Sequence, residues 1–423
     1  MLSLLVLLTV AQPAVDSPST APSLTIQQAV TTAKKQHPSL SVARARTMGA
    51  DARADQARAP LRPSLDASGR FSASTSSPFN SQFNNRTSYS GGLSGSILVY
   101  DFDRTKNRLE AAKTSAIAQK FSETGVAQDV ALDARVAFIN ARAAKDLVVI
   151  AKQRLANEQR HLKQSEAFVE VGTRPAIDLA KAKTLVANAK AAVAQTENNY
   201  EIAKARLNAA MGVSGSTDYD VADTKLSAIE GENGSASELY NEAVTNRPEL
   251  AAAKADIRAQ QLTLEASKKG LHPSVRLGTD LSVGGSDLNR PNWTAGLGLS
   301  ISFSLFDGGA NDARVRSDRA NLMALNAQKQ NLDQQTWLAV EQSRLAVRSA
   351  KAELLAANEG HEAAKELLTL AEGRYQQGAG NAIELSDAQL VLTNAASRQV
   401  QATFKLETAR AQLLRTLGRT SWT

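Results

Sequence analysis

Two stretches of the chain change from an alternating to a helical pattern of hydrophobic residues. In residues 301–305, isoleucine, phenylalanine and leucine alternate with serine, which is the period-two pattern of a half-buried strand. From Ala310 onward the chain shows only charged, polar and alanine-rich helical spacing, and a similar change occurs near Tyr100. The pattern therefore predicts, at two places, a strand that is followed almost directly by a long helix.

The two transitions belong to an internal duplication. Matching prolines are 210 residues apart, at Pro38 and Pro248 and at Pro63 and Pro273. Further along the chain the interval is 206 residues, between Tyr100 and Phe306, Gly172 and Gly378, and Gly212 and Gly418. Because each interval holds over several positions, we interpret 24–212 and 237–418 as two repeats, joined by a polar linker at 213–236.

Each repeat is expected to contain a first helix, a pair of strands, a very long helix and a last helix. The strand pairs are predicted at 63–101 and 273–306, the long helices at 104–169 and 310–375, and the last helices at 176–211 and 382–417. Capping-box patterns mark the start of the first helices, at Thr25 with Gln28 and at Ser235 with Glu238. Each first helix is predicted to run unbroken to the segment before the strands. Heptad spacing gives the long helices a coiled-coil character, and each should be about 100 Å long.

The predicted strands are apolar on one side only. Between Val275 and Val283, apolar residues alternate with serine, Arg276 and Asp280. Strands of about ten residues with one apolar face suit a transmembrane barrel, which contacts lipid outside and water inside. A soluble antiparallel sheet covered on one face by helices is the alternative. Because four strands cannot close a barrel and an open edge in hydrocarbon leaves backbone groups unsatisfied, a barrel requires association of several copies.

Composition limits the function classes. Only 4% of the 423 residues are aromatic, which favours long packed helices over globular cores. The net charge is +7, but basic and acidic residues are interspersed and no basic stretch is interleaved with aromatic residues, so we expect no nucleic-acid partner. The sequence has no cysteine, and its four histidines are scattered without metal-ligand spacing. Without a phosphate-binding loop or a nucleophile elbow, we expect no cofactor and no enzymatic activity.

The N-terminal segment has features of an export signal. Residues 2–10 are apolar but too few to span a bilayer, and a small-x-small pattern follows at 9–11. We therefore expect 1–11 to be a signal peptide and 12–23 a linker, with 419–423 as a C-terminal tail. A buried N-terminal strand is the alternative for the first segment. Acylation as a lipoprotein is excluded because no cysteine follows the apolar core.

The order and spacing of these motifs resemble the TolC-type outer membrane efflux proteins over nearly the whole mature chain. The matching segments are LRPSL, VYDFDR, VEVGTRPAIDL and LNAAMG in the first repeat and LHPSV, LFDGG, YQQGAGNAIEL and LRTLG in the second. The resemblance implies an α+β homotrimer, in which a twelve-stranded barrel in the outer membrane continues into a helical periplasmic tunnel. It also implies a passive exit duct that receives cargo from an inner-membrane transporter through a periplasmic adaptor protein. An exported structural coiled-coil trimer or adhesin without a conducting barrel is the alternative.

The same resemblance places the functional residues in the turns after the long helices, which would form the periplasmic tip. The implied adaptor-binding residues are Val171, Gly172, Thr173, Gln377, Gly378 and Ala379. Glu384 and Asp387 match the family's constricting acids, and Asp178 is the counterpart of Glu384 in the first repeat. Three copies of these acids would form a ring that favours cations. Alternatively, Asn381 with Glu384 is a helix start at which an acid complements the helix dipole.

Two further residues of the tip are implicated by the resemblance. The basic residue that many family members carry in the second repeat would sit at Gly380, whereas this chain has Arg174 at the matching place in the first repeat. We therefore consider a closing contact between Arg174 and either Glu384 or Asp387 of an adjacent helix pair. Tyr375 matches a tip tyrosine of the family, although a residue near a helix end can equally serve in packing.

Overall fold

A computed structural model describes residues 23–76, 84–224, 227–286 and 290–419 of the chain. The predicted signal peptide at 1–11 lies outside these residues, as do all but one residue of the linker at 12–23 and all but one of the tail at 419–423. Within the described ranges, no helix combines the length and the apolar character that crossing a bilayer requires.

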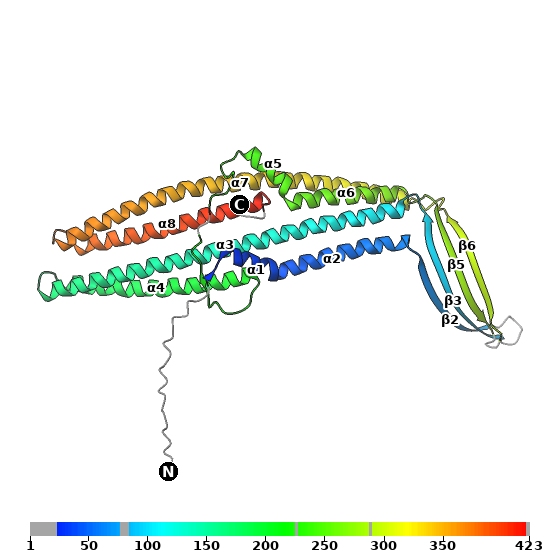
Figure 1. Cartoon of the computed structure of the whole chain (residues 1–423), viewed down its shortest axis with the longest axis horizontal. Coiled ribbons are helices and arrows are strands. Elements are labelled where there is room, and N and C mark those ends of the chain that lie inside the picture. The colour runs from blue at the N-terminus through cyan, green and yellow to red at the C-terminus, as the bar shows by residue number, and fades with distance from the viewer. Residues whose placement is uncertain (1–22, 77–83, 225–226, 287–289, 420–423) are drawn as a thin grey trace, which may run out of the picture. The chain divides into compact units, whose positions relative to one another are not determined.

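The two repeats contain the same order of elements (Figure 1). The first has helices α1 (Ile26–Gln36) and α2 (Pro38–Arg58), a short 3-10 turn η1 (Ala59–Leu61), strands β2 (Ser64–Ser76) and β3 (Asn84–Tyr100), and helices α3 (Arg104–Glu170) and α4 (Ala176–Met211). The second has helices α5 (Ala236–Asn246) and α6 (Pro248–Lys268), strands β5 (Ser274–Gly285) and β6 (Asn292–Ser302), and helices α7 (Ala310–Gln376) and α8 (Ala382–Thr416). The long helices α3 and α7 have 67 residues each.

The prediction of one unbroken first helix in each repeat was wrong. A proline begins a new helix in both repeats, Pro38 at the start of α2 and Pro248 at the start of α6. Proline forces the preceding residue out of the helical conformation, and His37 and Arg247 are accordingly extended. The capping bonds do form, since Gln28 N donates to Thr25 Oγ1 over 3.3 Å and the Thr25 N–H donates to Gln28 Oε1 over 2.8 Å.

A four-stranded antiparallel sheet has the order β2-β3-β5-β6. Its register aligns apolar residues from all four strands on one face, as in the row formed by Ala67, Leu93, Leu281 and Ala295. That face is open, because Leu297 is 77% exposed and Leu65 75% exposed. The alternative of a soluble sheet covered by helices therefore does not describe this chain.

Strand β6 is shorter than the alternating pattern predicted. Its pairing ends where Ser302 meets Ser274, the first residue of β5. The residue before it is Pro273, which has no backbone N–H to extend the ladder. Residues 303–306 therefore keep the alternating sequence without belonging to the strand.

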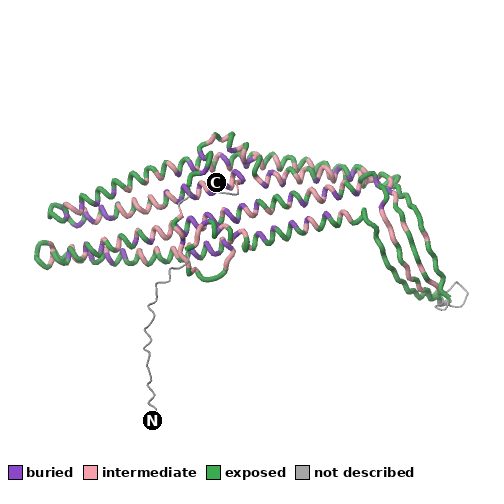
Figure 2. Tube along the Cα trace, in the orientation of Figure 1, coloured by how far each residue is buried: buried purple, intermediate pink, exposed green. Residues whose placement is uncertain are grey.

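Contacts divide the chain into two compact units. The described residues of the first unit are 23–35, 133–224, 227 and 353–408, and those of the second, which includes the sheet, are 36–76, 84–132, 228–286, 290–352 and 409–419. Buried positions recur along the helices, whereas the strands are mostly exposed (Figure 2). One core of the first unit is formed by Ile26, Ala29, Phe138, Ala141, Leu207, Met211 and Val221.

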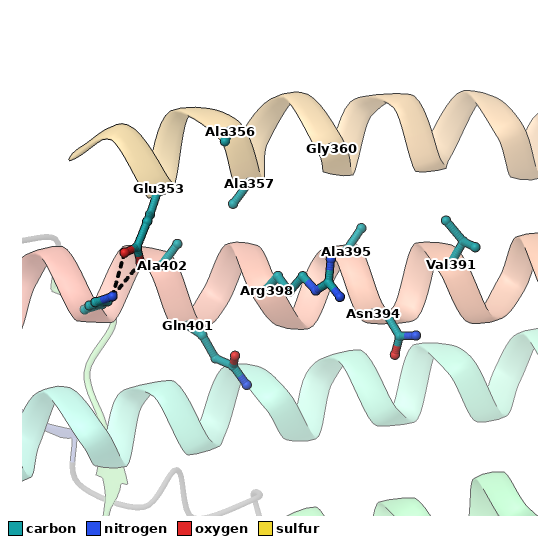
Figure 3. A pocket seen from close by; sticks show the side chains of 11 residues that line it. Glu353, Ala356, Ala357, Gly360, Val391, Asn394, Ala395, Arg398, Gln401 and Ala402 are labelled. Atoms are coloured by element: carbon teal, nitrogen blue, oxygen red, sulfur yellow. Dashed lines mark hydrogen bonds and ion pairs between the residues drawn. The ribbon is translucent and has the colours of Figure 1, made fainter. Parts of the chain in front are cut away.

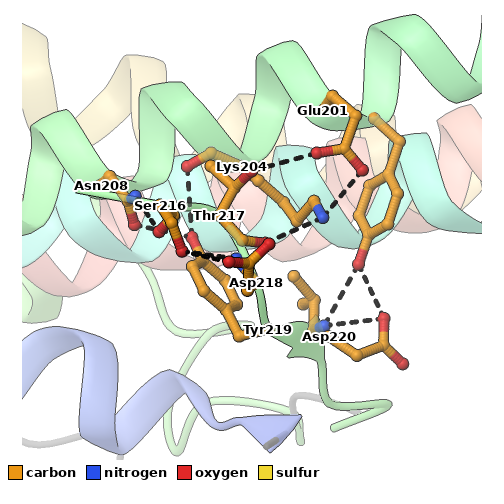
Figure 4. A network of polar contacts seen from close by, with 10 residues as sticks. Glu201, Lys204, Asn208, Ser216, Thr217, Asp218, Tyr219 and Asp220 are labelled. Carbon is orange, nitrogen blue, oxygen red and sulfur yellow. Dashed lines mark hydrogen bonds and ion pairs between the residues drawn. The ribbon is translucent and has the colours of Figure 1, made fainter. Parts of the chain in front are cut away.

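The start of the inter-repeat linker is fastened to the first unit by polar contacts. Strand β4 (Asp220–Val221) lies within the linker and pairs in parallel with β1 (Ser23–Leu24). Figure 4 shows the adjoining network, in which the Tyr200 hydroxyl donates to Asp220 over 2.7 Å and the Tyr219 hydroxyl to the Asn208 side chain over 2.9 Å. Burial raises the pKa of Tyr219 to about 12, so this hydroxyl stays protonated and remains a donor at neutral pH.

The end of the linker is fastened to the second unit through Glu232. Arg410 Nε donates to the Glu232 carboxylate over 2.8 Å, and Lys351 Nζ lies 2.7 Å from it. Burial alone would raise the pKa of Glu232, but the hydrogen bonds from Arg410 and Lys351 outweigh it and lower the pKa to about 2. Glu232 is therefore a charged anchor throughout the physiological pH range.

Candidate functional site

Two glycine-containing turns form the predicted tip, and both belong to the first unit. Gly172 ends α3 and Gly378 ends α7, each in the left-handed conformation with φ of 74° and 73°. The residue after each glycine donates its backbone N–H to a carbonyl five residues earlier, over 3.0 Å in both turns. This closing pattern requires a positive φ, so a residue with a side chain would be strained at either position.

The predicted adaptor-binding residues lie on the surface of these turns. Val171, Gly172, Thr173, Gln377, Gly378 and Ala379 are all exposed. Sequence reasoning missed two neighbours, Ile177 and Ile383, which are also exposed. They are 206 residues apart, the same interval as the turn glycines, so the repeat pattern contained the signal needed to find them.

Arg174 joins the two turns, but not through an acid. Its Nη2 donates to the backbone carbonyl of Gly380 over 3.0 Å, and its guanidinium lies 5.1 Å from the centre of the Tyr375 ring. Glu384 instead pairs with Arg374, with 3.1 Å between its Oε1 and the arginine Nε. Within one chain, the contact considered for Arg174 with Glu384 or Asp387 is thus absent among the described residues. A contact between neighbouring copies stays a prediction.

Tyr375 is a packing residue within the single chain. It is 1% exposed and lies among Leu368, Ala371, Ala382, Leu385 and Ala388. The rings of His161 and Phe168, both on α3, are centred 5.0 and 6.1 Å from its ring. The tyrosine therefore links α3 to the α7–α8 turn, which agrees with the packing interpretation of its position.

The acids lie at the starts of the last helices. Asn381 caps α8, because its Oδ1 accepts hydrogen bonds from the backbone N–H groups of Ile383 and Glu384 over 2.9 and 2.8 Å. Glu384 is half-buried, Asp387 is exposed, and Asp178 occupies the first turn of α4 as Glu384 does that of α8. Asp178 and Glu384 favourably oppose the positive end of a helix dipole, whereas Asp387 lies one turn further along α8. This role does not exclude a role as a gate.

A group of buried polar side chains beside the tip was also missed. Glu158, His161 and Ser165 are buried on α3, and Gln389 is buried on α8. Burial raises the pKa of Glu158 and lowers that of His161. The α3 residues are spaced by three and four positions and so occupy one helix face. Polar residues at heptad positions that normally face a neighbouring helix were the sequence signal that could have revealed this group.

A separate groove of about 710 Å³ lies between α7 and α8 (Figure 3). Its lining includes Ala356, Ala357, Gly360, Ala395 and Ala402. The ion pair of Lys405 with Glu353, 2.7 Å between Nζ and Oε2, borders it. None of the predicted site residues lines this groove.

Comparisons with known proteins agree on one family. The family model described as outer membrane efflux protein matches residues 29–213 and 239–419, one match for each repeat. BepC of Brucella suis is 23% identical over 79% of this chain and 73% of its own length, and OpmQ of Pseudomonas putida is 24% identical over 93% and 85%. The solved structure of CusC superposes with a TM-score of 0.81 at 19% identity and covers 97% of this chain and 99% of that one.

Proposed function

Because the chain belongs to the outer membrane efflux protein family, we propose that three copies assemble into one continuous duct. The chain is an outer-membrane exit duct of efflux or secretion, located in the outer membrane and extending into the periplasm. The observation that best supports the trimer is the exposed apolar face of a sheet with two open edges.

The strands that need partners are β2 and β6, which lie at the two ends of the sheet order. In hydrocarbon, an open strand edge leaves backbone N–H and C=O groups without hydrogen bonds. Pairing β6 of one copy with β2 of the next removes both edges and gives twelve strands from three copies of four. The polar face, with Asp66 and Asp280, would then surround a water-filled lumen.

We propose that the tip docks on a periplasmic adaptor and, through it, on an inner-membrane transporter. Exposed apolar side chains at Val171, Ile177 and Ile383 offer contact area beside the turn glycines. OpmQ is a pyoverdine export protein and CusC belongs to a cation efflux system. We infer that the partner transporter supplies the energy and selects the cargo, and that the duct is passive and catalyses no reaction.

We place the gate in the first two turns of α8. Glu384 and Asp387 are three residues apart and therefore neighbours on the helix surface. Asn381 already satisfies the first backbone donors of α8, so capping does not require these acids. Three copies would bring six carboxylates to the mouth, where a single sign of charge favours cations.

Replacing both Glu384 and Asp387 with alanine is expected to reduce the preference for cations several-fold, because six negative charges are removed where ions pass. The measurement is the reversal potential of the purified trimer in planar bilayers under a salt gradient. As a control, Glu359→Ala with Glu366→Ala removes the same charge from exposed positions of α7 away from the turn and should preserve the preference. Unchanged selectivity in the tip variant would show that these acids do not form the gate.

Arg174→Ala is expected to open the tip more than Arg374→Ala. Arg174 is half-buried and connects the two turns through Gly380 and Tyr375. The Arg374–Glu384 pair is largely exposed, and such pairs contribute about 0–1 kcal/mol. Single-channel conductance and the uptake of bulky antibiotics by cells should therefore rise mainly in Arg174→Ala. Equal conductance of the two variants would show that Arg174 does not hold the tip closed.

A further inference from the structure

His161 occupies the junction between α3 and the α7–α8 turn. The imidazole is 5% exposed and meets the Tyr375 ring edge-on, at an interplanar angle of 70°. The guanidinium of Arg174 also lies over the Tyr375 ring. Imidazole, phenol and guanidinium thus form one series that connects α3, α7 and the α3–α4 turn. The imidazole contacts Tyr375, and Tyr375 in turn contacts the arginine that joins the two turns.

A small polar cavity of about 80 Å³ adjoins this series. Besides His161 and Tyr375, its lining includes Asn157, Arg160, Gln164, Glu372, Gln376 and Gln389. Three buried atoms of these side chains have no hydrogen-bond partner among the described residues, namely His161 Nδ1, Tyr375 OH and Gln389 Oε1. The cavity has room for a few water molecules, and polar walls of this kind are hydrated in proteins. The imidazole can therefore exchange protons with water.

Within the part of the chain that the structure describes, three acids and three bases surround His161 on α3, α4, α7 and the α3–α4 turn, and α8 lines the same cavity with the uncharged side chains of Leu385 and Gln389. The acids are Glu158 on α3, Asp178 on α4 and Glu372 on α7. The bases are Arg160 on α3, Lys181 on α4 and Arg174 in the α3–α4 turn. Burial is the largest effect on the imidazole and lowers its pKa. The packed arrangement therefore favours neutral His161.

We propose that His161 is an acid-sensitive latch of the duct. The neutral imidazole supports the Tyr375–Arg174 contact and keeps the tip closed, and protonation releases the α7–α8 turn. The inference rests on the proposed role of the tip as a gate. Opening the tip hydrates His161 and returns its pKa towards the ordinary 6.5, so the open state binds protons more strongly. Falling pH consequently shifts the equilibrium towards the open duct.

The test is the open probability of the full-length trimer in planar bilayers between about pH 7.5 and pH 5, a range that brackets ordinary histidine titration. Each pKa unit separating the two states gives a tenfold bias per copy at pH below both values. We expect a marked rise in opening on acidification in the wild type. His161→Phe, which keeps a ring against Tyr375 but binds no proton, should lose this rise. His361→Gln changes a histidine that lines a different cavity and should retain it.

Several outcomes would overturn the latch. These are an unchanged open probability in acid, a rise that persists in His161→Phe, or loss of the rise in His361→Gln. If the phenylalanine variant does not assemble, His161→Gln takes its place, because it also lacks a titratable side chain and should also lose the rise in open probability. A trimer that forms no pore at any pH would instead contradict the proposed function itself.

Discussion

Leu93→Arg should prevent assembly in the outer membrane, whereas Ser94→Arg, one residue further along the same strand, should be tolerated. Leu93 lies near the middle of β3 on the apolar face, opposite Ala67 and Leu281. An arginine facing lipid near the bilayer midplane costs about 2–4 kcal/mol, and the cost recurs in every copy of the trimer. The yield of heat-modifiable trimer in the outer-membrane fraction measures the effect.

Ser94→Arg is a sharp control because it adds the same side chain to the other face. Ser94 pairs with Asp66 on β2 and with Asp280 on β5, so the new guanidinium lies between two carboxylates. Opposite charges on paired strands contribute about 0.2–1 kcal/mol in favour of the sheet. Equal loss of trimer in both variants would show that the two faces do not meet lipid and water as proposed.

The faces of the sheet were predictable because side-chain direction in a strand depends only on whether a position is odd or even. If Ile301 and Phe303 lie on one face, the alternation and the antiparallel register determine which face every other strand residue occupies. The ends of the strands were less predictable. Ser302 ends β6 because its partner strand begins only at Ser274, and pairing between segments is not visible in either segment alone.

The break in each first helix had a signal in the sequence, namely a proline, that was not interpreted as a break. Pro38 and Pro248 served as markers of the duplication, and the helical pattern continues on both sides of each. Proline is well accepted in the first turn of a helix, so one helix can stop and another start with a single extended residue between them. A capping-box start and a continuing periodicity therefore did not guarantee an unbroken helix.

At the tip, the repeat pattern predicted the positions of the turn glycines, but it did not predict which side chains contact each other. The nearness of Arg174 to Gly380 depends on how the α3–α4 hairpin faces the α7–α8 hairpin, and no local pattern specifies that orientation. The pairing of Arg374 with Glu384 spans a turn whose geometry was predicted, yet several basic residues compete for such acids in this sequence. The sequence gives His161 no role because the four histidines lack metal-ligand spacing, and only its burial beside Tyr375 distinguishes it.

The second large effect is expected at Arg142 on α3, where Arg142→Ala should destabilise the chain by about 3–5 kcal/mol. Arg142 is 5% exposed, and its Nη1 lies 3.4 Å from Glu407 Oε1 on α8. Its Nη2 lies 2.7 Å from Asp223 Oδ1 in the linker, and its guanidinium lies over the Phe404 ring. Removing the arginine leaves the buried Glu407 carboxylate without this counter-charge. The temperature at which the detergent-solubilised trimer unfolds should fall accordingly.

Lys405→Ala is the matched control, since it also breaks an ion pair between α8 and a neighbouring helix. Its partner is Glu353 on α7, and their side chains are 58% and 45% exposed. Exposed pairs contribute at most about 1 kcal/mol, so this variant should unfold close to the wild-type temperature. Arg142→Met with Glu407→Leu should lose less stability than the sum of the two single changes, because the double variant removes both charges of this buried pair. Strictly additive losses would mean that Arg142 acts through its packing on Phe404 or its bond to the linker, and not through Glu407.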